Sequence, residues 1–457
     1  MSYDLAVVGA GPAGLAAADT AARAGLRVAL VDAAARAGGQ YWRHRAGSPP
    51  PDMITPAGVT HHAGSAVWYV DPAPSVGPGR PGEPGEPGEP GFTLHTAHGP
   101  IAARRLVLAT GAYDRVVPFP GWDLPGVVTA GGAQALLKGD GVLVGRRVAV
   151  AGTGPFLLPV AAGLARAGAR VVGIFEAGHP FGFARHPRAV LGAAKLAEAV
   201  SYAAILARYR VPYRTRYAVV AAHGQDTVEA VSVARLDRPG AVRKVACDAL
   251  AVGYGFTPQL ELHLALGCAT RVDVDGSLVV TVDADQATSV PDVYAAGEAT
   301  GVGGVALAVA EGRLAGAAAV IAAGGTDPLP ARLRRRLVRQ RAAQRRFAAA
   351  MHAVHRTPGS WPGWLADDTL VCRCEEVPYA AVRAAVADLG ATDARTVKLL
   401  VRPGMGWCQG RVCGYATAAL TADLCGRTIT ESDLAAFAHR PLAQPVRLAD
   451  LAAPDTD

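Results

Sequence analysis

Four cysteines near the C-terminal end of the chain have the spacing of a metal site. One residue separates the first pair in "VCRCEEV", four separate the second pair in "GMGWCQGRVCGY", and 33 residues lie between the pairs. Four thiolates on two short loops can hold zinc or a [2Fe-2S] cluster. A one-residue gap strains tetrahedral zinc chelation, whereas two bridged irons spread their ligands more widely. The spacing favours a cluster, and its expected ligands are Cys372, Cys374, Cys408 and Cys413.

The remaining thiols, Cys247, Cys268 and Cys425, lack such spacing, and we expect them to be buried small apolar residues. The N-terminal run "MSYDLAVVGAGPAGLAAA" has no basic region before its apolar stretch, so it does not resemble a secretory signal. Later apolar stretches are interrupted by charges such as Glu311 and Arg313. We therefore expect a cytoplasmic protein that is not an integral membrane protein.

A second site for chemistry lies at the N-terminus, where a glycine-rich turn joins a short apolar strand to a helix. Gly9, Gly11 and Gly14 have the GxGxxG arrangement, and Asp32 ends the strand "RVALVD" that follows the helix. The glycines allow a tight turn, close approach of a pyrophosphate and close packing of helix on strand. The free N–H groups of the helix N-terminus favour phosphate, and the acid can bind a ribose. This unit predicts a dinucleotide site.

The pattern recurs with one change. Gly152 and Gly154 fill the first two glycine positions, Glu176 ends the next strand, and Leu157 occupies the third glycine position. Its bulk would hold the helix away from the strand. If the unit binds a nicotinamide dinucleotide, Glu176 favours NAD over NADP because a carboxylate repels the extra phosphate. A Rossmann-type domain that keeps its fold without the ligand is an equal alternative, so NAD is only a possible cofactor.

These units predict an α/β protein with two Rossmann-like dinucleotide-binding domains and a small helical C-terminal [2Fe-2S]-binding domain. The predicted boundaries are 1–117 and 245–325 for the first dinucleotide-binding domain, 118–244 for the NAD-binding-like domain, 326–366 for a helical linker and 367–457 for the cluster domain and tail. The repeat at residues 77–91 is expected to be a solvated hairpin insertion, and the arginine-rich residues 332–346 a helix. That helix lacks base-stacking aromatics, so nucleic acid is not expected as a partner.

The cysteine segments resemble the helical [2Fe-2S] domain of the bacterioferritin-associated ferredoxin type. With four residues between the last pair, they are similar to the larger flavoprotein subunits of opine oxidases, hydrogen cyanide synthase and dye-linked proline or hydroxyproline dehydrogenases. The segments "GGQYW", "PFPGWDLPGVVTAGGAQALLK" and "GFTPQ" agree with this family. The resemblance implies thioredoxin-reductase-like domains, an FAD bound by the domain of residues 1–117 and 245–325, and hetero-oligomeric assembly.

Further flavin contacts are expected at two strand ends and after the first acidic strand. They are Gly39 and Gln40, Thr110 and Gly111 in "LVLATGAYDR", and Gly297 and Glu298 in "VPDVYAAGEATG". In the wider family the last carboxylate is more often Asp and binds the ribityl chain. Glu298 is one methylene longer, which changes the geometry of that contact.

An FAD accepts two electrons and a [2Fe-2S] cluster passes one, so their combination predicts a converter between substrate oxidation and one-electron transfer. No catalytic side chain is assigned; His61 and His62 are interpreted as exposed loop residues. From the family resemblance, the leading hypothesis is the electron-transferring subunit of a hetero-oligomeric dehydrogenase that acts on an amine or imino acid of the opine, proline, hydroxyproline or glycine type. Its expected partners are a small ferredoxin-like subunit together with an amino-acid-oxidase-like flavoprotein subunit. A stand-alone NADH-dependent reductase and a non-catalytic iron-sulfur sensor or scaffold are the alternatives.

Overall fold

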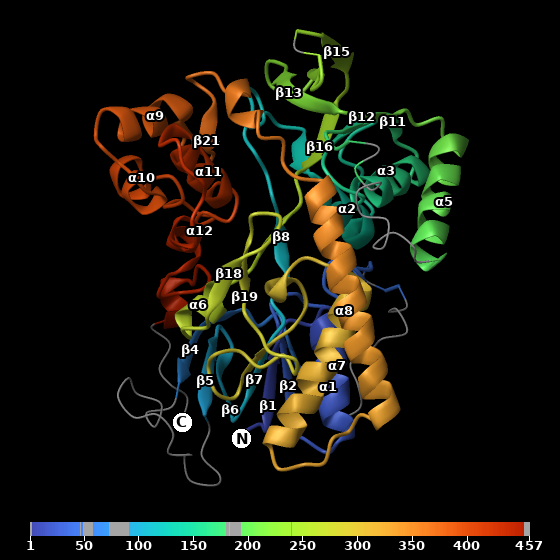
Figure 1. Ribbon diagram of the computed structural model, residues 1–457, viewed down its shortest axis with the longest axis vertical. Helices are drawn as coiled ribbons and strands as arrows, with labels where there is room; N and C mark the ends of the chain where they lie inside the picture. The colour runs from blue at the N-terminus through green and yellow to red at the C-terminus, as the bar shows by residue number, and fades with distance from the viewer. Residues whose placement is uncertain are drawn as a thin grey trace.

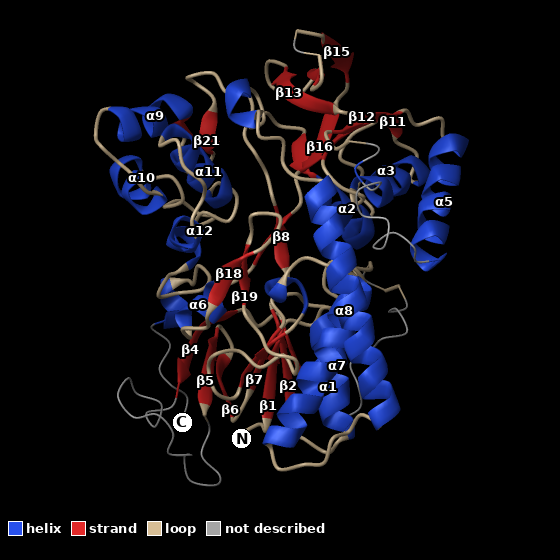
Figure 2. Cartoon of the chain, viewed as in Figure 1, coloured by secondary structure: helices blue, strands red, loops and turns tan. Residues whose placement is uncertain are grey.

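The computed structural model describes residues 2–45, 47–48, 58–72, 91–179, 182, 193–238 and 240–451. Two parallel sheets form the centres of two α/β lobes, one near the N-terminus and one at the opposite end of the molecule (Figures 1 and 2). A group of short helices near the C-terminus lies beside both lobes (Figure 1). The architecture is the mixed α/β fold that the sequence predicts.

The first lobe is built on a five-stranded parallel sheet with the order β20-β7-β1-β2-β3. Its strands are β1 (Leu5–Val8), β2 (Val28–Asp32), β3 (Val59–Ala63), β7 (Leu106–Leu108) and β20 (Val293–Ala295). Strands β1, β7 and β20 are apolar and fully buried along their whole length, as expected for a parallel sheet covered on both faces.

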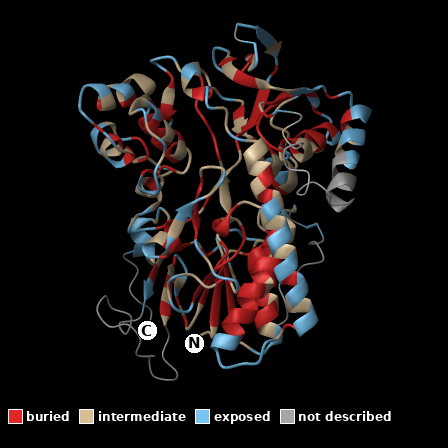
Figure 3. Cartoon of the chain, in the orientation of Figure 1, coloured by how far each residue is buried: buried red, intermediate tan, exposed pale blue. Residues whose placement is uncertain are grey.

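Two helices, α1 (Pro12–Arg23) and α7 (Val305–Ala322), pack tightly against one another on this lobe. A Cβ atom at Gly312 would lie 2.0 Å from the carbonyl oxygen of Ala13, and one at Gly316 would lie 2.4 Å from that of Ala17. Glycine is therefore required at both places for the two backbones to approach. Of the described helices, α7 is the one long and apolar enough to span a membrane, but most of it is buried inside the protein (Figure 3). Its apolar surface is used by the core.

The second lobe contains another five-stranded parallel sheet, with the order β12-β11-β10-β16-β9. Its strands are β9 (Val127–Thr129), β10 (Arg147–Gly152), β11 (Arg170–Glu176), β12 (Tyr213–Thr215) and β16 (Ala249–Gly253). The helices of this lobe are α2 (Ala130–Asp140), α3 (Leu157–Arg166) and α5 (Ala193–Arg208). The chain thus leaves the first lobe, builds the second and returns to the first.

Smaller antiparallel sheets and short helices complete the two lobes. The first lobe carries β4 (Val67–Pro72), β5 (Phe92–Thr96), β6 (Gly99–Ala103), β18 (Thr270–Val272), β19 (Leu278–Val280), α6 (Glu261–Ala265) and η3 (Gly297–Thr300). The second carries β13 (Tyr217–His223), β14 (Ala230–Arg235) and β15 (Val242–Ala246). Between the lobes, β8 (Ala112–Asp114) pairs with β17 (Phe256–Pro258). These two strands are the crossings between the lobes.

The linker is a long helix, α8 (Ala331–Val354), which confirms the helix predicted at residues 332–346. It packs against α7, and its outer side is exposed (Figure 3). Arg345 of α8 forms an ion pair with Glu311 of α7, with Nε 3.0 Å and Nη2 2.6 Å from Oε1. The Glu311 carboxylate also accepts the backbone N–H of Gly297 at 3.0 Å and the Thr300 hydroxyl at 2.9 Å. Glu311, the charge that interrupts the apolar run in the sequence, therefore connects α8 to η3 by a buried ion pair and hydrogen bonds.

The C-terminal region begins with η4 (Trp361–Trp364) and a short hairpin of β21 (Leu370–Cys372) and β22 (Val377–Pro378). Its helices are α9 (Tyr379–Ala387), α10 (Ala394–Val401), α11 (Gly414–Leu424), α12 (Glu431–Ala438) and α13 (Leu448–Leu451). The indole N–H of Trp122, in the predicted interdomain segment, donates to the Leu370 carbonyl at 2.6 Å. The small helical region is thereby attached to the second lobe.

Some local predictions fall outside the described residues or were wrong. Of the predicted hairpin insertion at 77–91, only residue 91 is described. His61 and His62 lie in β3 and are half-buried, so the interpretation as exposed loop residues was wrong. The strand pattern was missed because neither histidine reads as a strand residue, yet the His62 ring bonds the Tyr3 hydroxyl at 3.1 Å. Cys247 and Cys268 are buried as predicted, whereas Cys425 is only half-buried.

Candidate functional site

The first glycine turn has the geometry of a phosphate cradle. Gly9 follows β1 with a φ of +104°, and a Cβ atom there would lie 2.3 Å from the Ala109 carbonyl oxygen. A Cβ atom at Gly14 would lie 1.8 Å from the Gly9 carbonyl oxygen. Both positions require glycine, one for the turn and one for the packing of α1 on β1. Gly11 caps α1, so the free N–H groups of the helix face the turn.

Asp32 lies at the carboxyl end of β2, beside this turn. Its carboxylate accepts the backbone N–H of Ala10 at 2.5 Å and that of Ala34 at 2.6 Å. The residue is half-buried, so it is held in position and still reachable from solvent. Gly39 adopts a φ of +58° and approaches Gly11 so closely that a Cβ atom would lie 2.9 Å from the Gly11 Cα. Gln40 is exposed, and its side-chain oxygen accepts a hydrogen bond from Arg43 at 3.2 Å.

The two other predicted contact segments lie at the ends of neighbouring strands of the same sheet. Thr110 follows β7 and donates to the Gln259 carbonyl at 2.7 Å, and Gly111 has a φ of +78°. Gly297 follows β20, and Glu298 accepts the N–H groups of Gly303 and Gly304 at 3.2 and 3.1 Å. Burial raises the pKa of Glu298 to about 7, although these two N–H groups oppose the shift. The carboxylate is directed at the N-terminus of α7 in this structure.

The strand ends carrying these residues belong to β1, β2, β7 and β20, which are neighbours in one parallel sheet. Ligands of open α/β sheets bind outside the carboxyl ends of the strands. The glycine turn, the acid and the two distal segments therefore lie along one edge. At one end of this edge the glycine turn lets a pyrophosphate approach the backbone, and at the other end lie the backbone N–H groups of Gly303 and Gly304. This arrangement fits an extended dinucleotide such as FAD.

The second glycine turn has the tight backbone conformation of a dinucleotide-binding turn, but the acid beside it is covered by other residues. Gly152 has a φ of +135°, and a Cβ atom there would lie 1.7 Å from the Gly253 carbonyl oxygen. Glu176 is 1% exposed and accepts the N–H groups of Gly154 and Gly178, each at 2.9 Å. The ring of His355, just after α8, lies 3.3 Å from the same carboxylate. The acid that would meet an adenosine ribose is thus enclosed by the linker.

Leu157 changes where the second helix begins. It is the first residue of α3, five residues after Gly152, whereas α1 begins at Pro12, three residues after Gly9. The side chain is 1% exposed and packs in the core of the second lobe. The bulk at the third glycine position is accommodated by a later helix start, so the helix N–H groups lie further along the chain from the turn.

The four predicted cysteines converge from two turns. Cys372 ends β21 and Cys374 lies in the following turn, while Cys408 precedes a turn that leads into Cys413, the N-cap of α11. Glu376 and Gln409, one near each pair, have positive φ values of 50° and 55°, which non-glycine residues adopt rarely. Cys372 and Cys413 are buried, Cys408 is half-buried and Cys374 is exposed. The site therefore opens to solvent on the Cys374 side.

The four thiols contact one another in series, in the order Cys372, Cys413, Cys408 and Cys374. Cys413 hydrogen-bonds with both Cys372 and Cys408, and Cys408 also bonds with Cys374. Contact with Cys413 lowers the pKa of Cys372 to about 6 and that of Cys408 to about 5, although burial opposes both shifts. Backbone N–H groups, such as that of Gly404 at 3.5 Å from the Cys372 sulfur, add to the effect. The same contacts with Cys372 and Cys408 raise the pKa of Cys413.

No group of three or more His, Cys, Asp or Glu side chains in the described part of the chain is arranged to hold a metal ion. The contacts among the four thiols nevertheless show that their sulfurs converge, which ligation of one [2Fe-2S] cluster by four cysteines requires. The donor set of four sulfurs on two short turns fits such a cluster.

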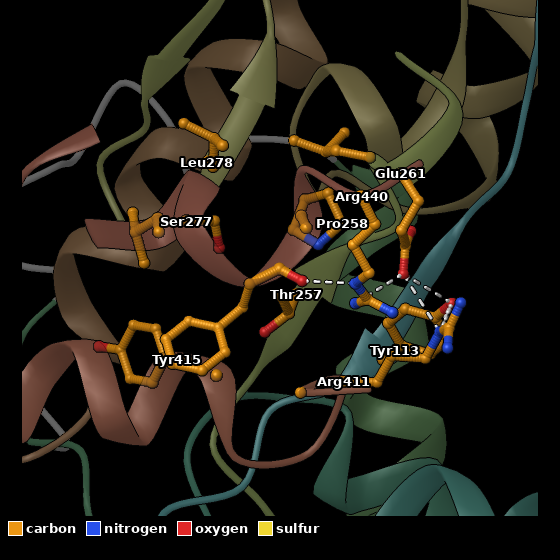
Figure 4. Close-up of a pocket in the computed structure, with 15 residues that line it drawn as sticks. Tyr113, Thr257, Pro258, Glu261, Ser277, Leu278, Arg411, Tyr415 and Arg440 are labelled. Carbon is orange, nitrogen blue, oxygen red and sulfur yellow. Dashed lines mark hydrogen bonds and ion pairs between the residues drawn. The ribbon is translucent and has the colours of Figure 1, made fainter. Parts of the chain in front are cut away.

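A polar bridge connects the cysteine turn to the first lobe, and its members were not predicted (Figure 4). Arg411 lies between Cys408 and Cys413, and its Nε donates to the Tyr113 hydroxyl at 2.6 Å and lies 3.1 Å from the Glu261 carboxylate. Tyr113 belongs to β8, two residues after Gly111. In the sequence, the signal for a role of Arg411 was its position inside "CQGRVC", between two predicted cluster ligands. Its partners could not be predicted, because Glu261 and Tyr113 lie 150 and 298 residues away in the chain. The bridge places the cysteine turn beside the flavin-type segment.

Family models match two parts of the chain. Residues 3–312, more than half of its length, match the pyridine nucleotide-disulphide oxidoreductase family. The chain belongs to this family. Residues 370–422 match the BFD-like [2Fe-2S] binding domain, which spans all four cysteines of the candidate cluster site. The fold class predicted from sequence is confirmed, as is the combination of an FAD and a [2Fe-2S] cluster that these two families imply.

Curated relatives cover nearly the whole chain. The chain is 32% identical to the hydrogen cyanide synthase subunit HcnB of Pseudomonas protegens, over 91% of this chain and 92% of the relative. It is 31% identical to an opine oxidase subunit of Agrobacterium tumefaciens, over 98% of this chain and 91% of the relative. The family resemblance predicted from the cysteine and glycine segments is confirmed. This member of the family is an FAD-dependent oxidoreductase with an attached [2Fe-2S] domain.

Solved structures support the fold. An L-proline dehydrogenase from P. horikoshii has a TM-score of 0.69 at 22% identity, with coverage of 99% of this chain and 80% of that chain. A thioredoxin reductase from T. acidophilum has a TM-score of 0.50 at 20% identity and covers 71% of this chain. The part of this chain that the second comparison does not cover is about as long as the predicted linker and cluster region together. The two lobes therefore have the thioredoxin-reductase-like arrangement expected from sequence.

Proposed function

We propose that this chain is the electron-transferring subunit of a hetero-oligomeric dehydrogenase that acts on an amine or imino acid of the opine, proline, hydroxyproline or glycine type. The observation that carries the proposal is the Arg411 bridge, which holds the cysteine turn against β8 beside the flavin-type edge. When bound, the two groups supply two-electron acceptance and one-electron release. The relatives are themselves subunits of opine oxidase and hydrogen cyanide synthase.

The FAD would lie along the sheet edge of the first lobe. Its pyrophosphate would meet the turn of Gly9, Gly11 and Gly14, and Asp32 would bind the adenosine ribose. The remaining contacts would come from Gly39, Gln40, Thr110, Gly111, Gly297 and Glu298. For Glu298 to reach the ribityl chain, its carboxylate would exchange one of its two backbone N–H partners for a hydroxyl.

The cluster would be held by Cys372, Cys374, Cys408 and Cys413. The exposure of Cys374 supports a route to an external acceptor on that side. Trp407, which precedes Cys408, is 83% exposed and would line the same opening. We therefore place the one-electron partner, a small ferredoxin-like subunit, at this opening.

The amine would be oxidised by a separate amino-acid-oxidase-like flavoprotein subunit, because no acid–base pair for that step is found among the described residues of this chain. The assembly would be cytoplasmic. The test is to purify the chain with and without the protein encoded beside it and to assay amine-dependent dye reduction. The chain alone should be coloured and inactive, and the complex active. Efficient oxidation of proline or an opine by the single chain would contradict the proposal.

The rival activity is an NADH-dependent reductase, and the enclosure of Glu176 argues against it. With Glu176 1% exposed and His355 beside it, NADH could bind in the second lobe only if the end of α8 moved away. If NADH does not bind, Gly152 and Gly154 serve only the fold of the second lobe. Stopped-flow mixing with NADH decides the matter: flavin absorbance should remain unchanged, and rapid bleaching without a partner would favour the reductase.

A further inference from the structure

The side chain of Phe437, near the end of α12, packs against the segments that hold the cysteines. A Cβ atom at Gly404, whose N–H meets the Cys372 sulfur, would lie 2.7 Å from the Phe437 ring. A Cβ atom at Gly410 would lie 2.9 Å from the same ring, and one at Gly414 would lie 3.0 Å from the Phe437 Cβ. Phe437 is 4% exposed. It therefore closes the buried side of the cluster site.

Two cationic side chains are held beside Phe437. The Lys398 ammonium lies 5.6 Å from the centroid of the Phe437 ring and donates to the Ala436 carbonyl at 3.4 Å. Arg440 Nε donates to the Phe437 carbonyl at 2.7 Å, and the Arg440 side chain is only 9% exposed. Both positive charges are therefore anchored to the residue that packs on the cysteine segments.

These cations have few acidic partners. Arg440 lies beside Arg411 and Glu261 in the pocket between the cluster region and the first lobe (Figure 4). The Glu261 Oε1 atom lies 3.1 Å from Arg411 Nε and 3.8 Å from Arg440 Nη2, so one carboxylate serves two guanidinium groups. Within the described part of the chain, no carboxylate pairs with Lys398. Three positive charges therefore meet one carboxylate.

The other negative charge on this side comes from the cysteine sulfurs. Burial lowers the pKa of Arg440, and Glu261 and Cys408 oppose the shift; burial also lowers the pKa of Lys398, and Cys413 opposes that shift. A cluster of two irons, two sulfides and four thiolates is negatively charged, and its negative charge grows by one unit when it accepts an electron. Nearby positive charges therefore favour the form that holds the extra electron.

We propose that Arg440 and Lys398 raise the reduction potential of the cluster, and that Phe437 is the positioning residue that holds both charges against the cysteine segments. Net charge is one of the factors that set the potential of such a cluster. On the exposed side of the site, basic and acidic side chains are equal in number, namely Arg373, Arg402, Glu375 and Glu376. A higher potential favours the transfer of one electron from a reduced flavin to the cluster. The inference requires the cluster but is independent of the proposed amine substrate and partner subunits.

Potentiometric titration of the holoprotein with dithionite and redox mediators, followed by electron paramagnetic resonance, tests the proposal. Arg440→Gln should lower the equilibrium constant for cluster reduction at least about tenfold, which is about 59 mV for a one-electron couple. Lys398→Gln should shift it in the same direction by less, because Lys398 is half-buried. Arg440→Lys keeps the charge and should keep the wild-type potential. Arg383→Gln is the matched control, because Arg383 is exposed, paired with Asp367 and screened by solvent and salt.

Iron content and the g values of the reduced cluster separate a charge effect from damage to the site. Both should match the wild type, because no substitution changes a cluster ligand. If Arg440→Gln loses iron, Lys398→Gln decides the matter. An unchanged or raised potential in the Gln variants would overturn the proposal, as would equal shifts in Arg440→Gln and Arg440→Lys. A wild-type chain without iron would contradict the cluster itself and this proposal with it.

Discussion

Arg345→Leu is predicted to lower the free energy of unfolding of the first lobe, although Arg345 lies on α8 and is not a predicted flavin contact. The Arg345 side chain is 25% exposed and the Glu311 side chain 1%, and the guanidinium makes two contacts to that carboxylate and one of 2.7 Å to the Gly301 carbonyl. Removing one partner of a buried pair costs about 3–5 kcal/mol. Partial solvent access to Arg345 favours the lower end, about 3 kcal/mol. For a lobe of roughly 200 residues this lowers the melting temperature by about 6–12 °C.

The loss should also reach the flavin edge, because the same Glu311 carboxylate accepts the N–H of Gly297. Differential scanning calorimetry and flavin fluorescence after gel filtration measure both effects. Arg346→Leu is the matched control, because Arg346 is the exposed neighbour on α8. In a Glu311→Gln background the Arg345 substitution should cost much less, because no buried charge is left unpaired. An equal cost in both backgrounds, or a change below about 1 kcal/mol, would refute the reasoning.

Three other perturbations follow from the geometry. Gly9→Ala should abolish flavin retention while iron content stays unchanged, because the new Cβ would lie 2.3 Å from the Ala109 oxygen; Gly163→Ala, whose nearest contact would be 3.5 Å, should retain flavin. Cys374→Ser should reduce bound iron, measured by a colorimetric assay, whereas Cys425→Ser should not. Burial lowers the pKa of His263 to about 4, so protonation favours the unfolded state and stability should fall by up to about 3 kcal/mol between pH 6.5 and 4. Melting curves of His263→Leu should lack that part of the pH dependence, and an unchanged dependence would exclude His263 as its source.

The features that sequence predicted are those encoded by neighbouring residues. The turn containing Gly9, the acid Asp32 at the next strand end and the two cysteine pairs each lie within a short segment whose spacing is the chemical requirement. The helix at 332–346 could be predicted for the same reason, from an uninterrupted run of helix-forming residues.

The features that sequence missed depend on contacts between distant segments. Arg411 meets Tyr113 across 298 positions, and His355 covers Glu176 across 179. Nothing in the local pattern of either segment indicates which surface it will contact. Glu311 shows the same limit, because in sequence it is an interruption of an apolar run, and only the packing of α8 on α7 makes it an ion-pair partner.

An anaerobic reductive titration of the purified chain, followed by visible absorbance and electron paramagnetic resonance, tests the central claim most directly. The account predicts uptake of about three electrons per chain, two by the flavin and one by the cluster, with a paramagnetic signal that requires all four cysteines. Uptake of about two electrons without a paramagnetic iron signal, or tightly bound zinc in place of iron, would contradict it.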